Sequence, residues 1–159
     1  PDGTEITFFL RKGVKWHDGE PFTARDVEFT YRKLIDPSVA TPYSGDFERI
    51  RKLDIIDDHT VKVTYKEPFA PALSSWGISM MPEHILNNED LNKGPFGRSP
   101  VGTGPYKLKK WKTGEKVELA FNPEYFEGRP YIDRYIYRVI RTAPRYSWSS
   151  RPEGSTGRG

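Results

Sequence analysis

The sequence predicts an α/β fold with short helices and a mixed, largely antiparallel sheet. The first observation is a series of short segments in which apolar and polar residues alternate, as in half-buried strands. The second is one segment, residues 23–35, whose apolar residues recur at helical spacing. The third is an aromatic content of 14 %, which is far too high for a disordered chain and sufficient for a core.

The chain opens with a predicted strand at residues 4–10, where Ile6, Phe8 and Leu10 alternate with their neighbours. A short extended segment and a turn at residues 17–21 follow. Asp-Gly in that turn supplies left-handed backbone geometry, and the proline that ends it interrupts strand pairing.

A helix is predicted to begin at Thr23, because Thr-x-x-Asp, ending at Asp26, resembles a capping box. Its expected apolar face consists of Val27, Tyr31, Leu34 and Ile35. Asp-Pro at residues 36–37 ends the helix, because the residue before a proline avoids helical geometry.

The remaining elements are expected to be short. They are a helix near 46–50, strands at 53–56 and 60–65, a loop or helical turn at 67–73, a short helix opened by Pro82, a polar loop at 87–104, a hairpin of 106–111 with 116–121, and a last strand at 131–140. No internal repeat is found.

The formal charge of +3 does not indicate a nucleic-acid partner. Residues 141–159 hold four of the 25 basic residues and one of the 22 acidic ones, which leaves 21 of each in residues 1–140. Since this body is neutral, it offers no basic stripe for a phosphate backbone.

Cysteine is absent, which excludes disulfides, thiolate metal sites and a cysteine nucleophile. No run of about 18 apolar residues predicts a membrane-spanning helix. The first residues show neither an initiator Met nor a leader peptide, so the chain is interpreted as a cut piece or a mature form.

His17, Asp18 and Glu20 lie close together and are the first candidates for a catalytic site. A turn that leads into a helix cap also explains them and is the preferred interpretation. The other histidines, His59 and His84, are isolated, whereas a metal site needs three or four ligands. No GxSxG motif is present. We therefore predict no catalytic residue, no metal site and no cofactor.

The segment GTGPY at residues 102–106 could be taken for a phosphate-binding glycine loop. It matches neither GxGxxG nor the P-loop pattern, and it precedes a predicted strand rather than a helix. A structural turn is therefore the preferred interpretation.

Four segments occur in an order that resembles the family 5 extracellular solute-binding proteins, which are dipeptide-, oligopeptide- and nickel-binding receptors of ABC importers. They are PDGTEITFFLRKGVKWHDGEPFTARDVEFTYRKL, LDIIDDHTVKVTYKEP, MMPEHIL and SPVGTGPYKLKKWKTGEKVELAFNPEYFEGRPYIDRYIYRVI. The resemblance implies a type II periplasmic-binding-protein fold of two lobes, with residues 1–140 forming part of the first lobe. It also implies a binding protein rather than an enzyme, located outside the cytoplasm. The expected partners are a peptide or similar small solute and a membrane permease.

The resemblance also suggests ligand contacts in two segments, TPYS and SWGIS. The residues expected to contact the ligand are Tyr43, Ser44, Trp76, Gly77 and Ser79. Burial in the core is the alternative for the two aromatic residues. A secreted hydrolase acting on peptides or glycosides is the alternative function.

Residues 141–159 depart from the family pattern, with 13 of 19 residues being Arg, Ser, Gly or Pro. Restoring one base after Ile140 permits a reading of IPDRATIFLELKAGGIDWTG, which resembles the family throughout. We therefore expect this tail to be a frameshift product and disordered.

Overall fold

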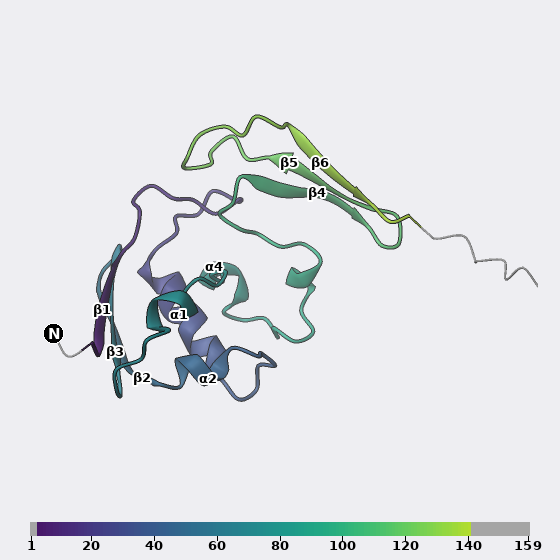
Figure 1. Cartoon of the computed structure of the whole chain (residues 1–159). Helices are drawn as coiled ribbons and strands as arrows, with labels where there is room; N and C mark the ends of the chain where they lie inside the picture. The colour runs from purple at the N-terminus through teal and green to yellow at the C-terminus, as the bar shows by residue number, and fades with distance from the viewer. Residues whose placement is uncertain (1–2, 141–159) are drawn as a thin grey trace, which may run out of the picture.

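The computed structural model describes residues 3–140, and the predicted frameshifted tail lies outside these residues. The described chain contains two three-stranded antiparallel sheets, joined by helices and loops (Figure 1). The first sheet has the order β1–β3–β2 and contains β1 (Glu5–Phe9), β2 (Ile50–Asp57) and β3 (Thr60–Tyr65). The second has the order β4–β5–β6 and contains β4 (Tyr106–Lys112), β5 (Lys116–Phe121) and β6 (Arg134–Arg138).

The strands confirm the antiparallel prediction, but they form two sheets rather than one mixed sheet. Every strand pairing between residues 3 and 140 is antiparallel. β3 lies between β1 and β2, with Val63 opposite both Ile6 and Leu53. β4 and β5 form a hairpin, and the following loop returns the chain so that β6 runs antiparallel to β5.

The longest helix is α1 (Ala24–Leu34), and its N-terminus is capped as the sequence predicts. The backbone N–H of Thr23 donates to the Asp26 carboxylate at 2.9 Å, and the Thr23 hydroxyl accepts from the N–H of Arg25 at 3.3 Å. These bonds satisfy backbone donors that have no partner within the first turn of a helix.

The other helices are single turns: α2 (Ser44–Phe47), α3 (Ala72–Ser75), α4 (Glu83–Leu86) and the 3-10 helix η1 (Pro95–Gly97). The helix expected near residues 46–50 is found at Ser44–Phe47, and it ends before Ile50 because that residue already belongs to β2. β2 is longer than predicted, and the last strand is shorter.

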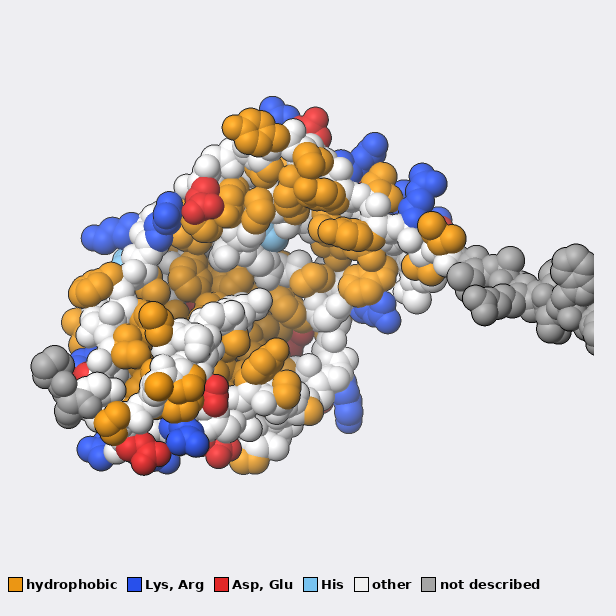
Figure 2. All heavy atoms as spheres, in the orientation of Figure 1, with side chains coloured by type: hydrophobic (Ala, Val, Ile, Leu, Met, Phe, Trp, Pro, Cys, Tyr) orange, Lys and Arg blue, Asp and Glu red, His pale blue; other side chains and the backbone are white. Residues whose placement is uncertain are grey.

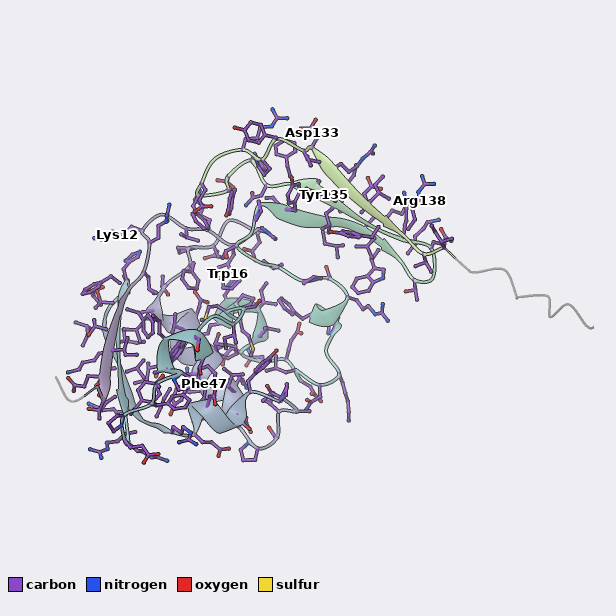
Figure 3. The ribbon with its side chains drawn as sticks, viewed as in Figure 1. Lys12, Trp16, Phe47, Asp133, Tyr135 and Arg138 are labelled. Atoms are coloured by element: carbon purple, nitrogen blue, oxygen red, sulfur yellow. The ribbon has the colours of Figure 1, made fainter. Side chains whose placement is uncertain are left out.

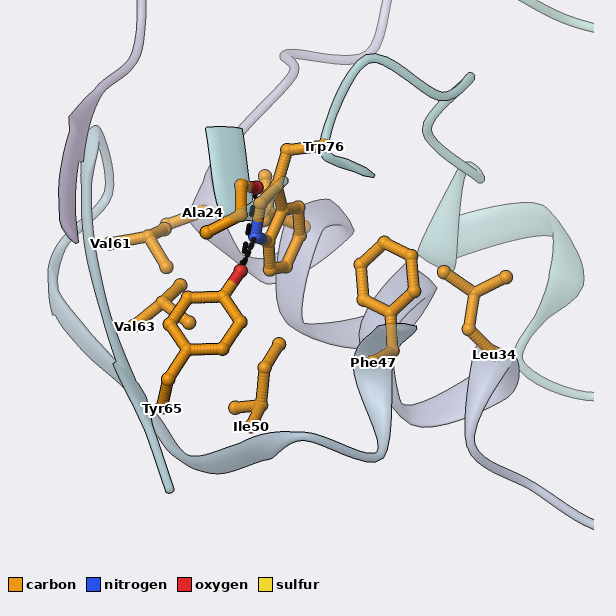
Figure 4. Packing of buried hydrophobic residues seen from close by; sticks show 10 residues of the cluster. Ala24, Leu34, Phe47, Ile50, Val61, Val63, Tyr65 and Trp76 are labelled. Carbon is orange, nitrogen blue, oxygen red and sulfur yellow. Dashed lines mark hydrogen bonds between the residues drawn. The ribbon is translucent and has the colours of Figure 1, made fainter. Parts of the chain in front are cut away.

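The hydrophobic core lies between the β1–β3–β2 sheet and the helices that cover it (Figure 4). Val61, Val63 and Tyr65 point from β3 toward Trp76 and Phe47, and all five side chains are buried. The indole N–H of Trp76 donates to the Tyr65 hydroxyl at 3.1 Å. Burying side chains of this size stabilises the fold by about 1.5–3 kcal/mol each.

His17 is one of the residues that attach the second sheet to the rest of the molecule, beside the ion pair of Lys15 with Glu124. The His17 backbone N–H donates to the carbonyl of Gly102 at 2.8 Å. The side chain of Lys107, on β4, donates to the carbonyl of His17 at 3.0 Å. In Figure 3, Trp16 lies near the loops that join the second sheet to the rest of the molecule, whereas Tyr135 lies on the second sheet itself.

Candidate ligand-binding site

A pocket of about 910 Å³ opens beside the core. Its wall is formed by the loop at 39–43, by α2 and α3, by residues 77–79 and by the loop at 89–97. Figure 2 shows that this face of the molecule is hollowed below the second sheet, with hydrophobic side chains inside the hollow. The volume is within the range of small-molecule sites.

Three of the five predicted ligand contacts line this pocket: Tyr43, Gly77 and Ser79. Tyr43 is 55 % exposed, so most of its ring remains available for a contact. Tyr43 is therefore not a buried core residue, which was the alternative interpretation. The fold brings these residues together from two segments that are more than 30 positions apart in the sequence.

Ser44 and Trp76 are not among the residues that line the pocket. Ser44 begins α2, and its carbonyl accepts from the N–H of Glu48 at 2.9 Å. Trp76 is only 8 % exposed and packs edge-on against Phe47, with ring centroids 5.0 Å apart. Since its N–H is also occupied, the structure favours the core alternative for Trp76.

Several residues of the wall were not expected from the sequence. The loop at 87–104 was interpreted only as polar and glycine-rich, yet it contributes Glu89, Asp90 and Phe96. Asp46, on α2, is a further lining residue, and its carboxylate accepts a hydrogen bond from the Ser75 hydroxyl at 2.6 Å. No local pattern signals these positions, because they converge only through the tertiary fold.

The cluster around His17 has a structural role. Trp16 and Glu20 close the turn with a backbone hydrogen bond of 2.8 Å, and Gly19 has a φ of 100°. The His17 Nδ1 accepts from the N–H of Gly102 at 3.1 Å. These contacts support the interpretation of this segment as a turn.

Asp18 and His84 form an ion-pair geometry at 2.8 Å near the same turn. Partial burial opposes the charged carboxylate, but the hydrogen bonds from His84 and the N–H of Glu20 lower the pKa of Asp18 overall. In the part of the chain that the structure describes, no hydroxyl is hydrogen-bonded to His84, and no group of three metal-ligating side chains is found.

The backbone groups of the GTGPY segment are hydrogen-bonded to other residues of this chain. The carbonyl of Gly104 accepts from the Asn122 side chain at 3.3 Å, and the carbonyl of Pro105 accepts from the Asn122 N–H at 2.8 Å. The N–H of Gly102 is occupied by His17. These bonds support the structural-turn interpretation over a phosphate loop.

The fold defines the class of this chain, which matches part of a type II periplasmic binding protein. The chain belongs to the bacterial extracellular solute-binding proteins of family 5, whose middle region matches residues 1–148. This confirms the resemblance inferred from the sequence. The match extends past residue 140, where the family-like part was expected to end. No helix within residues 3–140 has the length and apolar character needed to cross a membrane.

Two curated relatives illustrate the similarity. The chain is 39 % identical over 142 residues to the oligopeptide-binding protein AppA of Bacillus subtilis, covering 84 % of this chain and 26 % of AppA. It is 39 % identical over 138 residues to Protein XP55 of Streptomyces lividans, covering 87 % of this chain and 25 % of XP55. The chain therefore spans about a quarter of the length of these relatives.

Solved structures show the same fold. NikZ from Campylobacter jejuni, in complex with Ni(L-His), matches with a TM-score of 0.83 and 38 % identity over 87 % of this chain and 28 % of NikZ. Bacillus subtilis AppA, in complex with a nonapeptide, matches with a TM-score of 0.78 and 36 % identity over 87 % of this chain and 29 % of AppA.

Proposed function

We propose that the protein to which this chain belongs is the substrate-binding component of an ABC importer that captures a peptide or similar small solute. The pocket beside the core carries this proposal, because it combines the exposed ring of Tyr43 with Gly77 and Ser79. Family membership supports it, as do the names of relatives such as AppA and the probable D,D-dipeptide-binding protein DdpA of Escherichia coli.

Capture would occur outside the cytoplasm, and a membrane permease would receive the solute. Closure of two lobes around the ligand would exclude water and bury its apolar parts, which strengthens each polar contact. The family's description as extracellular supports this location.

This chain provides one wall of such a cleft. Binding has to overcome the lost motional freedom of ligand and protein, and one open wall leaves most groups hydrated. We therefore propose that the 159-residue chain alone binds peptide weakly or not at all.

Isothermal titration of the full-length protein against a peptide pool, a sugar pool and nickel tests the proposal. Saturable binding of one class without turnover is expected. Turnover of peptide or glycoside substrates would favour the hydrolase alternative. Tight peptide binding by the 159-residue chain would contradict the two-wall argument.

The tail at residues 141–159 is proposed to be a frameshift product without a binding role. Its composition, unlike that of the family-like body, supports this proposal. Sequencing the encoding DNA tests it: an intact frame that no single-base change restores to a family-like sequence would refute it.

A further inference from the structure

The second sheet separates cationic and aromatic side chains onto opposite faces. Residues directly opposite one another on paired strands share a face, and Glu118 lies opposite both Lys110 and Ile136. With the ion pair of Lys109 and Glu118, this register gives one face, here called the cationic face, the side chains of Lys109, Lys110, Lys112, Lys116, Arg134 and Arg138. The opposite face carries Leu108, Trp111, Val117, Leu119, Tyr135 and Tyr137. This second face, with the loop at 96–102, lines a smaller pocket, so the cationic face is directed away from that loop.

A buried carboxylate lies among these cations. Glu118 is 6 % exposed and forms ion pairs with Lys116 at 3.1 Å, Lys109 at 3.2 Å and Arg134 at 3.5 Å. The hydrogen bonds from Lys116 and Lys109 lower the pKa of Glu118 to about 2, so the carboxylate is ionised near neutral pH. Each ammonium has three N–H donors and the guanidinium has five, so these cations keep donors for other partners. Glu118 therefore holds three cations in place without using all of their donors.

The cationic face carries an excess of positive charge. Glu118 and Glu115, which pairs with Lys112 in the β4–β5 turn, are its two carboxylates against six cations, which leaves four positive charges. The balanced charge of residues 1–140 conceals this excess, because the fold gathers cations from three strands. Figure 2 shows Lys and Arg side chains along the border of the second sheet. The expectation that residues 1–140 offer no basic stripe is therefore wrong for this sheet.

Exposed apolar side chains accompany the cations. Ile136 lies between Arg134 and Arg138 on the cationic face and is 37 % exposed. Ile140, which follows β6, is 87 % exposed. Surfaces that combine cations with exposed apolar side chains bind to the interface of a bilayer, where phosphates attract the charges and the headgroup layer takes up the apolar groups.

The composition of this face favours a lipid surface over other polyanions. Single-stranded nucleic acid is bound by cations interleaved with aromatic rings, but the aromatic residues of these strands lie on the opposite face. Acidic protein partners are recognised mainly through Arg, whereas Lys is depleted in protein interfaces, and four of these six cations are Lys. Lysine contributes instead to a diffuse attraction of roughly equal strength per charge near anionic lipids.

We propose that the cationic face docks on the surface of a bilayer rich in anionic phospholipids, whose phosphates pair with its Lys and Arg side chains while Ile136 and Ile140 enter the headgroup layer. This inference goes beyond the proposed capture of a solute and does not depend on it, since it uses neither the large pocket nor its ligand.

Co-sedimentation of the 159-residue chain with vesicles tests the inference. The vesicles consist of phosphatidylcholine alone or with about one third phosphatidylglycerol, at about 50 mM and about 500 mM salt. We expect binding to the vesicles that contain phosphatidylglycerol, and we expect the higher salt to weaken it by about fivefold or more. Equal binding to both kinds of vesicle would overturn the inference.

Two pairs of substitutions test where the charge must lie. Lys110→Gln with Arg138→Gln removes two exposed cations of the cationic face and should weaken binding by about tenfold. Lys93→Gln with Arg51→Gln removes the same two residue types outside the second sheet and should change binding by less than about twofold. Equal losses in the two pairs would overturn the inference, because net charge would then explain the binding.

The remaining variants separate the cationic face from the basic residues 141–159 and charge from packing. Arg151→Gln with Arg158→Gln should leave binding within about twofold of wild type, and a tenfold loss there would overturn the inference. Lys110→Arg with Arg138→Lys keeps both charges and should bind like wild type. A loss in this exchange would show that the structure of β4 and β6, rather than their charge, explains the effect, and would also overturn the inference.

The apolar contribution has its own comparison. Ile140→Ser should weaken binding by about threefold, whereas Ile56→Ser, at an exposed position of the first sheet, should have no effect. Poly-L-glutamate provides the acidic-protein alternative: if the chain bound poly-L-glutamate through Lys110 and Arg138 but not the vesicles, the proposed lipid partner would be wrong. Solute titration of the full-length protein can succeed or fail independently of all these results.

Discussion

The Nδ1 atom of His17 accepts a hydrogen bond from the backbone N–H of Gly102 at 3.1 Å, across 85 residues of sequence. The other ring nitrogen, Nε2, lies 2.9 Å from the carbonyl oxygen of Gly104. An N–H can only donate and a carbonyl can only accept, so the ring must be the neutral tautomer with its proton on Nε2. Protonating Nδ1 would place its new N–H against the N–H of Gly102, and two donors cannot form a hydrogen bond.

The first prediction is therefore an acid-sensitive stability. Burial lowers the pKa of His17 from its usual 6.5, and Lys107 acts in the same direction, although the bond to Gly104 opposes them. Below pH 6.5 the unfolded chain binds this proton more readily than the folded chain. The stability contributed by His17 is complete above that pH and is lost as the pH falls through the folded-state pKa.

Urea unfolding between pH 5 and 8 measures this effect, with the range set by the usual titration of histidine at about pH 6.5. His17→Ala should cost about 1–2 kcal/mol at neutral pH and reduce the acid dependence. His59→Ala is the matched control, because His59 makes its turn contact through its backbone N–H. The His84–Asp18 pair is present in both variants. An unchanged pH profile in His17→Ala would contradict the prediction.

The second prediction concerns Asp26, whose carboxylate joins three segments. It accepts hydrogen bonds from the Trp16 indole at 3.3 Å, the Thr23 N–H at 2.9 Å and the Glu83 N–H at 3.0 Å. Asp26→Ala leaves these buried or half-buried donors without a partner and should destabilise the fold by about 3 kcal/mol or more. Denaturant titration measures the loss.

Glu28→Ala is the control for Asp26→Ala. Glu28 lies on the same helix, but its contact with Arg32 is an exposed pair at 3.9 Å. Such pairs contribute about 0.5 kcal/mol or less, so this variant should unfold close to wild type. Similar losses for the two substitutions would show that helix propensity, rather than the hydrogen bonds of Asp26, explains the effect.

The third prediction tests how closely the loop beside the pocket is packed. A Cβ at Gly94 would lie 2.7 Å from the Asp90 carbonyl oxygen, a backbone atom that cannot move away easily. Gly94→Ala should therefore destabilise the chain by about 1–3 kcal/mol or displace the loop. Gly97→Ala in the same loop meets no atom within 4 Å and should be neutral. Thermal unfolding of both variants, with amide chemical shifts of residues 87–97, distinguishes the outcomes.

The cap of α1 could be predicted from the sequence because it depends on local contacts. Thr23 and Asp26 are three positions apart, and the capping box forms as expected. The bonds from Asp26 to Trp16 and Glu83 could not be predicted, because they depend on how distant segments pack. The same limit applies to the sheet order, in which β3 lies between β1 and β2.

In the candidate site, too, only some of the features could be predicted from the sequence. The family resemblance pointed to the segments of Tyr43 and Trp76 alike, and no local pattern tells an exposed aromatic residue from a buried one within a loop. Their surroundings separate them: Tyr43 lies at the pocket and is mostly exposed, whereas Trp76 meets Phe47 and Tyr65. The acids of the wall were missed because Asp46 and Glu89 come from segments 43 positions apart.

The last prediction separates the roles of these two aromatic residues. Trp76→Ala removes a buried ring and its hydrogen bond to Tyr65, so the fold should lose about 3–5 kcal/mol. Tyr43→Ala removes a ring that is 55 % exposed. Its effect on unfolding should be about 0.5 kcal/mol or less. In the full-length protein, however, Tyr43→Ala should weaken solute binding by about 1–3 kcal/mol, the scale of losing an aromatic contact that closure buries.

Trp76→Phe provides the matched comparison, because it keeps an aromatic ring in the core while removing the indole N–H. It should recover part of the stability lost in Trp76→Ala and bind solute nearly as well as wild type, since the Trp76 side chain does not line the pocket. Urea unfolding and isothermal titration of the three variants measure both quantities. If Trp76→Phe weakened binding as much as Tyr43→Ala while remaining stable, Trp76 would be a ligand contact after all, reached through a rearrangement of residues 75–79 on closure.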